Sequence, residues 1–347
     1  MSPIDYKSSG VDIDAANEAV ERIREQVKST FTPHVLTDVG SFGAMVDADV
    51  ILKNYRHPVL VQSIDGVGTK MIVARMMNKY DTIGMDLVSA TCNDIIVHGA
   101  RPLTFLDYIA NDKLIPETVE KIVAGIAQAC RETGVSLIGG ETAEMPDTYL
   151  PGEHDLVGVI TGVVDRERIV SGKEIRTGDA VLGLGSSGLH TNGYSLARKL
   201  FFDAGKFKVN SSHSALEKSV GETLLEPHLN YTQPILTLLE QGVPIRGMAH
   251  ITGGGLVDNI PRILPQGCSV EISRGAWPEQ PVFTLLTKLG QLHEKEAFRT
   301  FNMGIGMVVI VSPELTDRVR RFLLQFRHVP VYEIGKVVKG DREVRFV

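Results

Sequence analysis

The hydrophobic and polar positions of the chain alternate between short apolar runs and longer amphipathic stretches, which is typical of strands that alternate with helices. Apolar runs predict strands at residues 58–64, 103–109, 135–138, 156–164, 180–185 and 306–311. Stretches with helical spacing, or bounded by proline and glycine, predict helices at residues 81–98, 116–133, 194–204, 234–241, 256–263 and 282–289, before a closing helix and strand. The pattern therefore indicates an α/β (α+β) fold.

The pattern is interrupted near residue 168. Residues 165–179 are charged, contain two glycines and have no clear period. A chain of 347 residues is long enough for about two domains, each with its own core. We therefore expect domains at residues 1–168 and 169–347, with a polar, exposed excursion at residues 205–223.

The composition is that of a folded globular protein, with 43% hydrophobic and 22% charged residues. A net charge of −6 argues against the broad electropositive surface that binds nucleic acids. Apolar runs fall short of the ~20 residues that span a bilayer, and the N-terminus lacks the pattern of a signal peptide. The three cysteines have no C-x-x-C spacing, which favours neither disulfides nor zinc. We expect a cytoplasmic protein that binds neither nucleic acid nor membrane.

The first candidate functional segment is residues 65–70, Asp-Gly-Val-Gly-Thr-Lys, which follow the first predicted strand. The carboxylate of Asp65 is suited to Mg²⁺, and Gly66 and Gly68 allow backbone N–H groups to approach phosphate oxygens. Lys70 adds a positive charge. The P-loop sequence G-x-x-x-x-G-K-[ST] is absent, and a turn with an exposed Lys70 is the alternative interpretation.

The helix predicted at residues 81–98 carries polar side chains along one stripe, because positions seven or eight apart return to nearly the same face. Asp86, Asn93 and Asp94 lie on this stripe among apolar neighbours. A buried carboxylate is costly unless it is paired or bound to a metal. The alternative is that the stripe is the solvated face of an amphipathic helix.

A third carboxylate follows the strand predicted at residues 135–138, in the sequence Gly139-Gly-Glu-Thr-Ala-Glu-Met-Pro146. If this run is a turn at the end of the strand, Glu141 lies at the same edge of the sheet as Asp65. Three acids at strand or helix ends suit hard cations, which prefer oxygen ligands. A helix-capping or turn role for Glu141 is the common alternative.

Residues 183–188 match G-x-G-x-x-G after a strand, with Asp203 twenty positions after the first glycine, as in dinucleotide-binding folds. The third glycine is followed by Leu-His-Thr-Asn-Gly and not by a packed helix, so the turn is too long and too polar for that interpretation. A loop that binds an anion or faces a substrate fits better. His190 in this loop is a candidate for proton transfer, and a surface group is the alternative.

The segment His250-Ile-Thr-Gly-Gly-Gly255 precedes the helix predicted from residue 256. Backbone N–H groups at a helix N-terminus favour anions, so phosphate is a natural ligand for this glycine loop. Glycine-rich loops also occur for steric reasons alone.

In this order and at these separations, five segments resemble aminoimidazole ribonucleotide synthetases, also called phosphoribosylformylglycinamidine cyclo-ligases. The segments are Asp65-Gly-Val-Gly-Thr-Lys, Asn93-Asp-Ile-Ile-Val-His-Gly-Ala-Arg-Pro, Gly139-Gly-Glu-Thr-Ala-Glu-Met-Pro, Ser186-Ser-Gly-Leu-His-Thr-Asn-Gly-Tyr-Ser and His250-Ile-Thr-Gly-Gly-Gly. The opening Tyr6-Lys-Ser-Ser-Gly-Val-Asp-Ile-Asp-Ala-Ala-Asn17 and the later Arg299-Thr-Phe-Asn-Met-Gly-Ile-Gly306 also resemble the family. The likeness covers nearly the whole chain, and five motifs in order are far more specific than one.

The resemblance implies a two-domain subunit in which each domain has a mixed β-sheet with packed helices, and in which the N-terminal sheets form the interface of a homodimer. It implies that the N-terminal domain binds ATP and Mg²⁺ and that the C-terminal domain completes the substrate and nucleotide cleft. The implied metal ligands are Asp65, Asp94 and Glu141, and the implied catalytic residues are Lys70, His190 and His250. Nucleotide or phosphate binding is implied for Asp65, Gly66, Gly68, Thr69, Lys70, Asn93, Gly140, Glu141, Thr142, Ser187, Asn192, Gly253, Gly254 and Gly255.

Members of this family convert formylglycinamidine ribonucleotide and ATP into aminoimidazole ribonucleotide, ADP and phosphate. Phosphorylation turns the formamide oxygen into a leaving group, and the amidine nitrogen then closes the ring. Positive charge and backbone N–H groups stabilise phosphoryl transfer, and ring closure needs a group that accepts a proton. His190 and His250 are the two candidates for that group, and the sequence leaves the choice open.

Relatives of this architecture include selenophosphate synthetase, thiamine-monophosphate kinase and a hydrogenase maturation factor. The absence of a cysteine before Cys92 argues against selenophosphate synthetase. Thiamine-monophosphate kinase is the enzymatic alternative, since it uses the same ATP and Mg²⁺ chemistry. A catalytically inert nucleotide-binding protein is the alternative of another class, and we would expect it to have lost an acid or a glycine loop.

Overall fold

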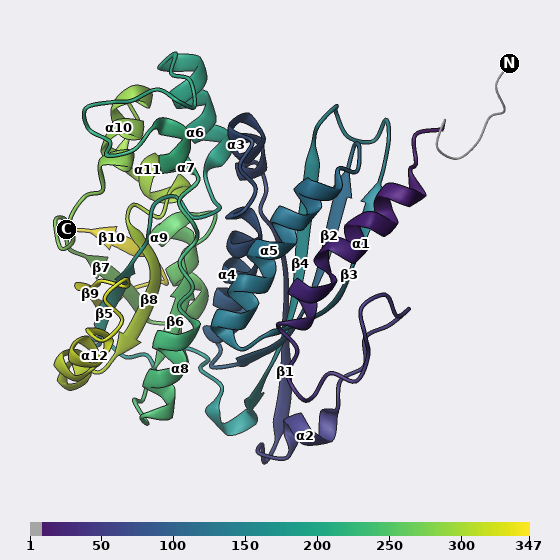
Figure 1. Cartoon of the computed structure of the whole chain (residues 1–347). Helices are drawn as coiled ribbons and strands as arrows, with labels where there is room; N and C mark the ends of the chain where they lie inside the picture. The colour runs from purple at the N-terminus through teal and green to yellow at the C-terminus, as the bar shows by residue number, and fades with distance from the viewer. Residues whose placement is uncertain (1–8) are drawn as a thin grey trace, which may run out of the picture. The chain divides into compact units, whose positions relative to one another are not determined.

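The computed structural model describes residues 9–347 and divides into two compact units (Figure 1). Unit 1 runs to Ile95 and continues over Arg101–Glu167, and unit 2 comprises Ile96–Ala100 and Arg168–Val347. Residues 6–8 of the opening motif lie outside the described part of the chain. Each unit has its own sheet, so the two are described in turn.

Unit 1 is built on a four-stranded mixed sheet with the strand order β1-β4-β2-β3. The strands are β1 (Pro58–Gly66), β2 (Arg101–Asn111), β3 (Ser136–Glu144) and β4 (His154–Asp165). β4 pairs antiparallel with β1 and β2, and β2 pairs parallel with β3. Strands β1, β2 and β3 therefore run in the same direction, with β1 and β3 at opposite edges of the sheet.

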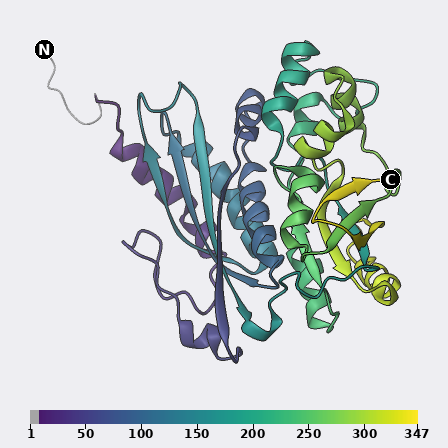
Figure 2. The ribbon, with the colours of Figure 1, turned by 180° about the vertical axis from the view of Figure 1, so that it is seen from behind.

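Helices cover one face of this sheet (Figures 1 and 2). The helices of unit 1 are α1 (Ile13–Lys28), α2 (Ala48–Leu52), α3 (Lys70–Met77), α4 (Ile83–Ile96) and α5 (Pro116–Thr133). α5 starts at Pro116, where a missing N–H costs nothing, and ends at Gly134, which takes the left-handed conformation with φ 72°. Phe105, Ile109 and Ile160 are fully buried side chains of the strands, and they belong to the core under the helices.

The opposite face of the unit 1 sheet carries apolar side chains that the described residues leave exposed. Leu60 and Ile64 on β1 are 61% and 67% exposed, and Leu106 on β2 is 39% exposed. Ile64 lies opposite Val159, which in turn lies opposite Leu106, so a row of apolar side chains crosses three strands. An open apolar face of this kind is typical of an interaction surface.

Unit 2 is built on a six-stranded sheet with the order β10-β7-β9-β5-β8-β6. The strands are β5 (Ala180–Gly185), β6 (Gly247–His250), β7 (Cys268–Ile272), β8 (Ile305–Val311), β9 (Val331–Lys339) and β10 (Val344–Phe346). Neighbouring strands are antiparallel except for β10 and β7, which are parallel. Every residue of β5 and β8 is buried, so this sheet is covered on both faces.

Two apolar cores flank the unit 2 sheet. Its helices are α6 (Tyr194–Arg198), the π-helix η2 (Lys199–Ala204), α7 (Val220–Leu224), α8 (Thr232–Glu240), α9 (Gly255–Asn259), α10 (Pro281–Gly290), α11 (Glu294–Thr300) and α12 (Thr316–Leu323), with 3-10 turns η3 (Ile260–Ile263) and η4 (Pro313–Leu315). The 3-10 turn η1 (Arg166–Arg168) begins in unit 1 and ends in unit 2. Leu182 and Leu184 of β5 share one core with α8 and α12, and Val181 shares the other with α9 and η3. Successive side chains of β5 thus enter different cores, as alternation along a strand requires.

Several predicted elements differ from the structure; among them, the helix predicted at residues 256–263 is α-helical only to Asn259 and continues as the 3-10 turn η3. The strand predicted at residues 135–138 continues through its glycines to Glu144, so Gly140, Glu141 and Thr142 are strand residues and not a turn. The helix predicted at residues 194–204 changes from an α-helix to a π-helix at Lys199. The excursion at residues 205–223 runs into α7, which is partly buried.

Candidate active site

The segment after β1 forms a turn that leads directly into α3. Asp65 is the penultimate residue of β1, and its Oδ1 accepts a 2.7 Å hydrogen bond from the N–H of Gly66. Gly68 has φ +62°, a conformation that favours glycine, and there is open space where its side chain would be. Thr69 precedes α3 as its N-cap residue, and Lys70 is the first residue of the helix. The strand and glycine turn predicted here are confirmed.

Lys70 does not extend from this turn as an accessible charge. Its side chain is fully buried, and its Nζ lies 2.7 Å from Oδ2 of Asp86 on α4, which is also fully buried. The expectation that a buried carboxylate on this helix is paired is confirmed for Asp86. The ammonium group of Lys70 pairs with a carboxylate in the core, and its expected role at nucleotide phosphate stays a prediction.

Asp65 and Asp94 lie on neighbouring elements of unit 1. The Oδ2 of Asp94, on α4, accepts a 2.9 Å hydrogen bond from the hydroxyl of Ser63 on β1. Ser63 and Asp65 are two positions apart in the strand, so their side chains point to the same, helix-covered face. The structure therefore brings Asp65 and Asp94 to the same side of β1, with the buried Asn93 next to Asp94 in the helix.

Glu141 is not part of this group. β3 and β1 lie at opposite edges of the sheet, roughly 14 Å apart at about 4.8 Å per strand. Glu141 lies opposite Tyr108 on the open face, whereas Gly140, one residue earlier, is level with Asp65 on the covered face. Among residues 9–347, no group of three or more His, Cys, Asp or Glu side chains is arranged to hold a metal ion. The structure therefore does not bring Glu141 to Asp65 and Asp94, and the metal role of all three residues stays a prediction.

The predicted residues of β3 instead line a hollow of about 730 Å³ along the free edge of this strand. The lining comes from α1, α5, β2, β3 and a loop, and comprises Ala16, Val20, Ile23, Val27, residues 38–44, Leu106, Asp107, Val123 and residues 137–142. Burial raises the pKa of Asp107 to about 7, although a hydrogen bond to its own backbone acts in the opposite direction. Sequence reasoning did not select Asp107.

Gly140 on β3 has no side chain, and this makes room for the carboxyl group of Asp107. A Cβ atom on Gly140 would lie 2.4 Å from Oδ1 of Asp107, which is closer than real Cβ contacts. Glycine at position 140 therefore has a steric reason inside a strand. This is why the double glycine does not end the strand as the sequence predicted.

In unit 2, the loop after β5 is fastened to the connection between α7 and α8. The hydroxyl of Ser187 donates to the carbonyl oxygen of Pro227, and the hydroxyl of Tyr231 donates to that of Gly185 at 2.8 Å. His190, in the same loop, has φ +60°, which is uncommon for a residue with a side chain. The surrounding contacts thus hold this loop in a defined conformation.

Three buried histidines meet beneath the loop. His190, His228 and His250 are 1%, 3% and 6% exposed. The rings of His190 and His228 stack with centroids 3.9 Å apart and planes inclined by 19°, and Nε2 of His228 lies 3.2 Å from Nε2 of His250. The structure therefore brings the two predicted histidines into one cluster through a third.

Sequence reasoning missed His228 because its segment has no glycine motif. The residue lies in Pro227-His-Leu-Asn-Tyr231, between α7 and α8. The sequence offered one signal for this site, which is the run of polar and aromatic residues between Pro227 and α8.

The glycine loop after β6 is held by one asparagine. Nδ2 of Asn259 donates to the carbonyl oxygens of Thr252, Gly253 and Gly255 at 3.3, 3.2 and 2.9 Å. A Cβ atom on Gly253 would have Oδ1 of Asn192 as its nearest neighbour, at 3.6 Å. The loop at residues 252–255 and the loop that carries Asn192 therefore lie side by side.

The three glycines of this loop are not equivalent. Gly254 and Gly255 have φ +96° and +56°, and a Cβ atom there would lie 2.6 Å from Asp258 Cβ and 2.0 Å from Phe298 O. The steric alternative therefore accounts for these two glycines. α9 has only five residues, so its dipole is a weak attraction for an anion, and Gly253 is the position with room for a ligand.

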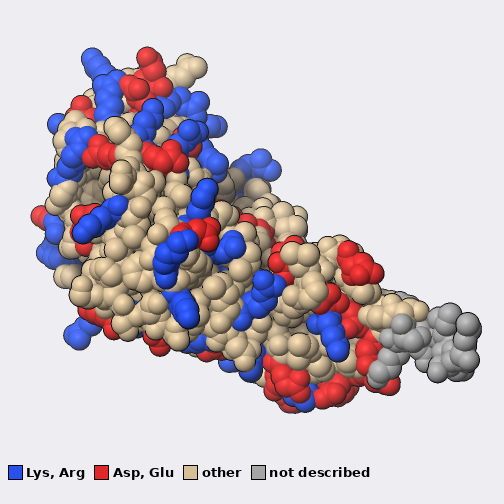
Figure 3. Space-filling model, turned by 90° about the horizontal axis from the view of Figure 1, so that it is seen from above, with Lys and Arg blue, Asp and Glu red and all other residues tan. Residues whose placement is uncertain are grey.

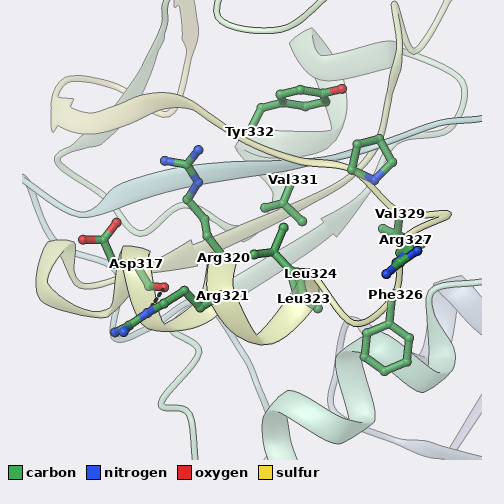
Figure 4. A pocket seen from close by; sticks show the side chains of 11 residues that line it. Asp317, Arg320, Arg321, Leu323, Leu324, Phe326, Arg327, Val329, Val331 and Tyr332 are labelled. Atoms are coloured by element: carbon green, nitrogen blue, oxygen red, sulfur yellow. Dashed lines mark hydrogen bonds between the residues drawn. The ribbon is translucent and has the colours of Figure 1, made fainter.

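A second hollow, of about 780 Å³, lies beside α12 and the start of β9 (Figure 4). Its lining includes Arg320, Arg321, Leu324 and Tyr332, and Leu324 is 72% exposed. No predicted site residue lines it, so it is not part of the candidate site.

On the face drawn in Figure 3, Lys and Arg side chains lie interspersed with Asp and Glu. Within the described chain, no helix has both the length and the apolar character needed to cross a membrane. Cys92, Cys130 and Cys268 are buried free thiols.

Comparison with known families defines the class of the protein. Residues 46–164 match the family described as AIR synthase related protein, N-terminal domain. Residues 176–347 match the corresponding C-terminal domain. The chain is therefore a two-domain protein of the AIR synthase related class.

Curated relatives narrow this class to one family of enzymes. The phosphoribosylformylglycinamidine cyclo-ligase of Brevibacillus brevis is 47% identical over 339 residues, which cover 98% of this chain and 97% of that protein. The protein of the same name from Pseudothermotoga lettingae is 49% identical over 339 residues, 98% of each chain. The chain belongs to the phosphoribosylformylglycinamidine cyclo-ligase family of enzymes.

Solved structures share the fold at lower identity. Thiamine-monophosphate kinase from Stenotrophomonas maltophilia superposes with a TM-score of 0.67 at 16% identity, over 94% of this chain and 95% of that one. The hydrogenase maturation protein HypE in complex with ATP superposes with a TM-score of 0.65 at 19% identity, over 94% and 90%. At this identity the likeness establishes the two-domain architecture alone.

Proposed function

We propose that the protein catalyses the ATP-dependent cyclisation of formylglycinamidine ribonucleotide to aminoimidazole ribonucleotide, with release of ADP and phosphate, in de novo purine biosynthesis. The observation that carries the proposal is identity of 47% and 49% to cyclo-ligases over nearly the full length of each chain. The ATP complex of a protein with the same fold supports nucleotide binding by this architecture.

Asp65 and Asp94 are the proposed ligands of Mg²⁺. Mg²⁺ prefers oxygen ligands and is commonly held by one or two carboxylates together with phosphates and water. The two carboxylates on the covered side of β1 fit such a site without a third acid. When bound, the ion supplies positive charge to the phosphoryl group during transfer.

Two parts of unit 1 support nucleotide binding. The turn at Gly66, Gly68 and Thr69 lets phosphate oxygens approach the backbone, because there is open space where a side chain of Gly68 would be. The hollow along β3 has a volume in the range of small-molecule sites, and Gly140 and Thr142 line it. We assign the phosphates to the turn and a nucleotide contact to the hollow.

Ring closure needs a leaving group and a base. An amide oxygen leaves poorly, so its conversion into a phosphate ester allows a weak nitrogen nucleophile to attack the same carbon. His190 and His250 are the predicted bases. Ser187, Asn192 and Gly253 lie in adjoining loops of unit 2 and are the proposed contacts for a substrate phosphate.

The protein is proposed to act as a cytoplasmic homodimer. The exposed apolar row on the open face of the unit 1 sheet supports an interface there. Glu141 is on this same face, so a dimer formed through it places Glu141 at the interface. Three buried free thiols are compatible with a reducing compartment.

A product assay tests the function. The protein is incubated with formylglycinamidine ribonucleotide, ATP and Mg²⁺, and the mixture is scored for an aminoimidazole by diazo coupling and for ADP. The proposal requires both products in equal amounts. Phosphorylation of thiamine monophosphate without any aminoimidazole would instead identify a kinase.

A further inference from the structure

The residues that follow α11 pack against both loops that are the proposed contacts for a substrate phosphate. A Cβ atom on Gly193, at the end of the loop after β5 (residues 186–193), would lie 2.6 Å from the ring of Phe301. A Cβ atom on Gly255, in the loop after β6, would lie 2.8 Å from the carbonyl oxygen of Phe301. Neither loop has room for a side chain at these positions. Residues 299–306, which resemble the cyclo-ligase family in sequence, therefore form a support shared by the two loops.

Asn302 bonds this support to the loop after β5 at two places. The residue is only 3% exposed. Its Nδ2 donates to the carbonyl oxygen of Gly188 at 2.8 Å, and its Oδ1 accepts from the N–H of Gly304 at 2.9 Å and from the hydroxyl of Ser186 at 3.1 Å. A backbone N–H only donates and a carbonyl oxygen only accepts, so these partners fix the orientation of the amide. The side chain of Asn302 therefore makes hydrogen bonds with both its oxygen and its nitrogen.

The turn that carries Asn302 is itself held by hydrogen bonds. Met303 has φ +50°, which is uncommon for a residue with a side chain. The Nε1–H of Trp277 donates to the carbonyl oxygen of Met303 at 2.8 Å, and the N–H of Ile305 donates to that of Asn302 at 3.0 Å. A conformation of this kind persists only where the surrounding contacts determine it. Asn302 thus bonds to the loop from a fixed position.

All three polar groups of Ser186 have partners in the structure. Its N–H donates to the carbonyl oxygen of Gly304 at 2.9 Å, its carbonyl oxygen accepts from Nε2 of Gln280 at 2.7 Å, and its hydroxyl donates to Asn302. The next residue is Ser187, a proposed contact for the substrate phosphate. Because Asn302 also holds the residue after Ser187, the backbone is fixed on both sides of Ser187.

From these contacts, and resting on the proposed function, we infer that Asn302 is a positioning residue for the ribonucleotide. It holds residues 186–188 in the conformation that receives the substrate phosphate. A loop that is already in its bound conformation loses little conformational freedom when the ligand binds, and this raises affinity. Asn302 acts through the loop and does not itself touch the substrate.

The kinetic test uses the full chain and the variant Asn302→Ala, which removes all three hydrogen bonds of the amide. Without them the loop is in the receiving conformation for only part of the time, and the apparent affinity falls by that fraction. We expect KM for formylglycinamidine ribonucleotide to rise about tenfold, with kcat within about twofold of wild type because bound substrate restores the loop. KM for ATP should be unchanged.

A purely structural role for Asn302 gives a different result. Loss of folded protein lowers kcat and leaves KM unchanged, because the molecules that remain folded bind as before. The matched control is Asn111→Ala in unit 1. Asn111 is fully buried, and its side chain makes hydrogen bonds with the carbonyl oxygens of Ile109 and Ala143 and with Nδ1 of His154. This variant should keep the wild-type KM for the ribonucleotide.

A second variant covers the case in which Asn302→Ala fails to fold. Gln280→Met keeps the length of the side chain and removes the donor to the carbonyl oxygen of Ser186. Loss of this one hydrogen bond should raise KM for the ribonucleotide about threefold, again with little change in kcat. Gln325→Met removes a comparable bond, to the carbonyl oxygen of Phe322, from an exposed glutamine of the same unit and should behave as wild type.

The third readout needs no substrate. Hydrogen exchange followed by mass spectrometry should show faster exchange at residues 186–193 in Asn302→Ala than in wild type, with unchanged exchange in β5 and β8. Wild-type exchange at residues 186–193, or a wild-type KM for the ribonucleotide in folded Asn302→Ala or Gln280→Met, overturns the inference and leaves the cyclo-ligase assignment intact. Absence of aminoimidazole with the wild-type protein overturns the proposed function, and the inference with it.

Discussion

Lys70 and Asp86 form a fully buried ion pair in unit 1. Both side chains have no exposed surface, and their charged atoms are 2.7 Å apart. A charge in such a position is tolerated because it is paired, so the two residues form one unit of stability.

This pairing predicts how stability responds to substitution. Lys70→Met leaves the carboxylate of Asp86 buried without its partner, and we expect a loss of about 3–5 kcal/mol in the free energy of unfolding. The double variant Lys70→Met/Asp86→Leu should recover most of this loss. Urea denaturation measures both effects. A double variant as unstable as Lys70→Met would contradict the core pairing, and a stable but inactive double variant would assign the pair a role in the reaction as well.

Asp94 tests the proposed metal site. Asp94→Asn keeps the shape of the side chain and an oxygen that accepts from Ser63, but it removes the charge. We expect a fall in rate on the order of 10²-fold or more, with normal stability. The measurement is turnover at limiting Mg²⁺, with Asp49→Asn on the exposed side of α2 as the control. Full activity of folded Asp94→Asn would remove the metal role.

At the scale of elements, the sequence predicted those structures whose signals are local. α5 has the predicted bounds because Pro116 and Gly134 are start and stop signals that act in any context. β3 was predicted too short because the reason for Gly140 is the side chain of Asp107 on the neighbouring strand. Such a reason is tertiary and cannot be read from one segment.

The features of the candidate site likewise divide into those that local sequence signals predict and those that depend on tertiary contacts. The turn after β1 and the loops of unit 2 follow from glycines and polar runs, so the sequence located them. The face on which Glu141 lies depends on strand register, and a shift of one residue reverses it. The bridging role of His228 depends on the packing of loops that are far apart in the chain.

Gly253 and Gly254, in the loop after β6, differ in the space around them and in backbone conformation, and this difference gives a prediction. Gly253→Ala has room in the structure, so it should fold normally and raise the KM for the ribonucleotide about tenfold if a phosphate approaches here. Gly254→Ala, at φ +96°, should instead lower stability by about 1 kcal/mol or more. Steady-state kinetics and urea denaturation separate the two effects. Unchanged KM values for both substrates in Gly253→Ala would exclude this loop from the site.

For the whole molecule, the open face of the unit 1 sheet predicts the oligomeric state. The double variant Leu60→Glu/Ile64→Glu places charges in the exposed apolar row, and we expect it to be monomeric in sedimentation velocity while the wild type is a dimer. Leu324→Glu changes an equally exposed leucine of unit 2 and should leave the dimer intact. A wild-type monomer, or a double variant that still dimerises, would contradict the proposed interface.

The central claim is that ATP activates the amide oxygen of the substrate and that this oxygen leaves as phosphate. The most direct measurement places ¹⁸O in the formyl oxygen of formylglycinamidine ribonucleotide and follows the label during turnover with ATP and Mg²⁺. The account predicts that inorganic phosphate carries the ¹⁸O and appears in amounts equal to ADP and the aminoimidazole. Formation of the aminoimidazole with unlabelled phosphate would contradict it.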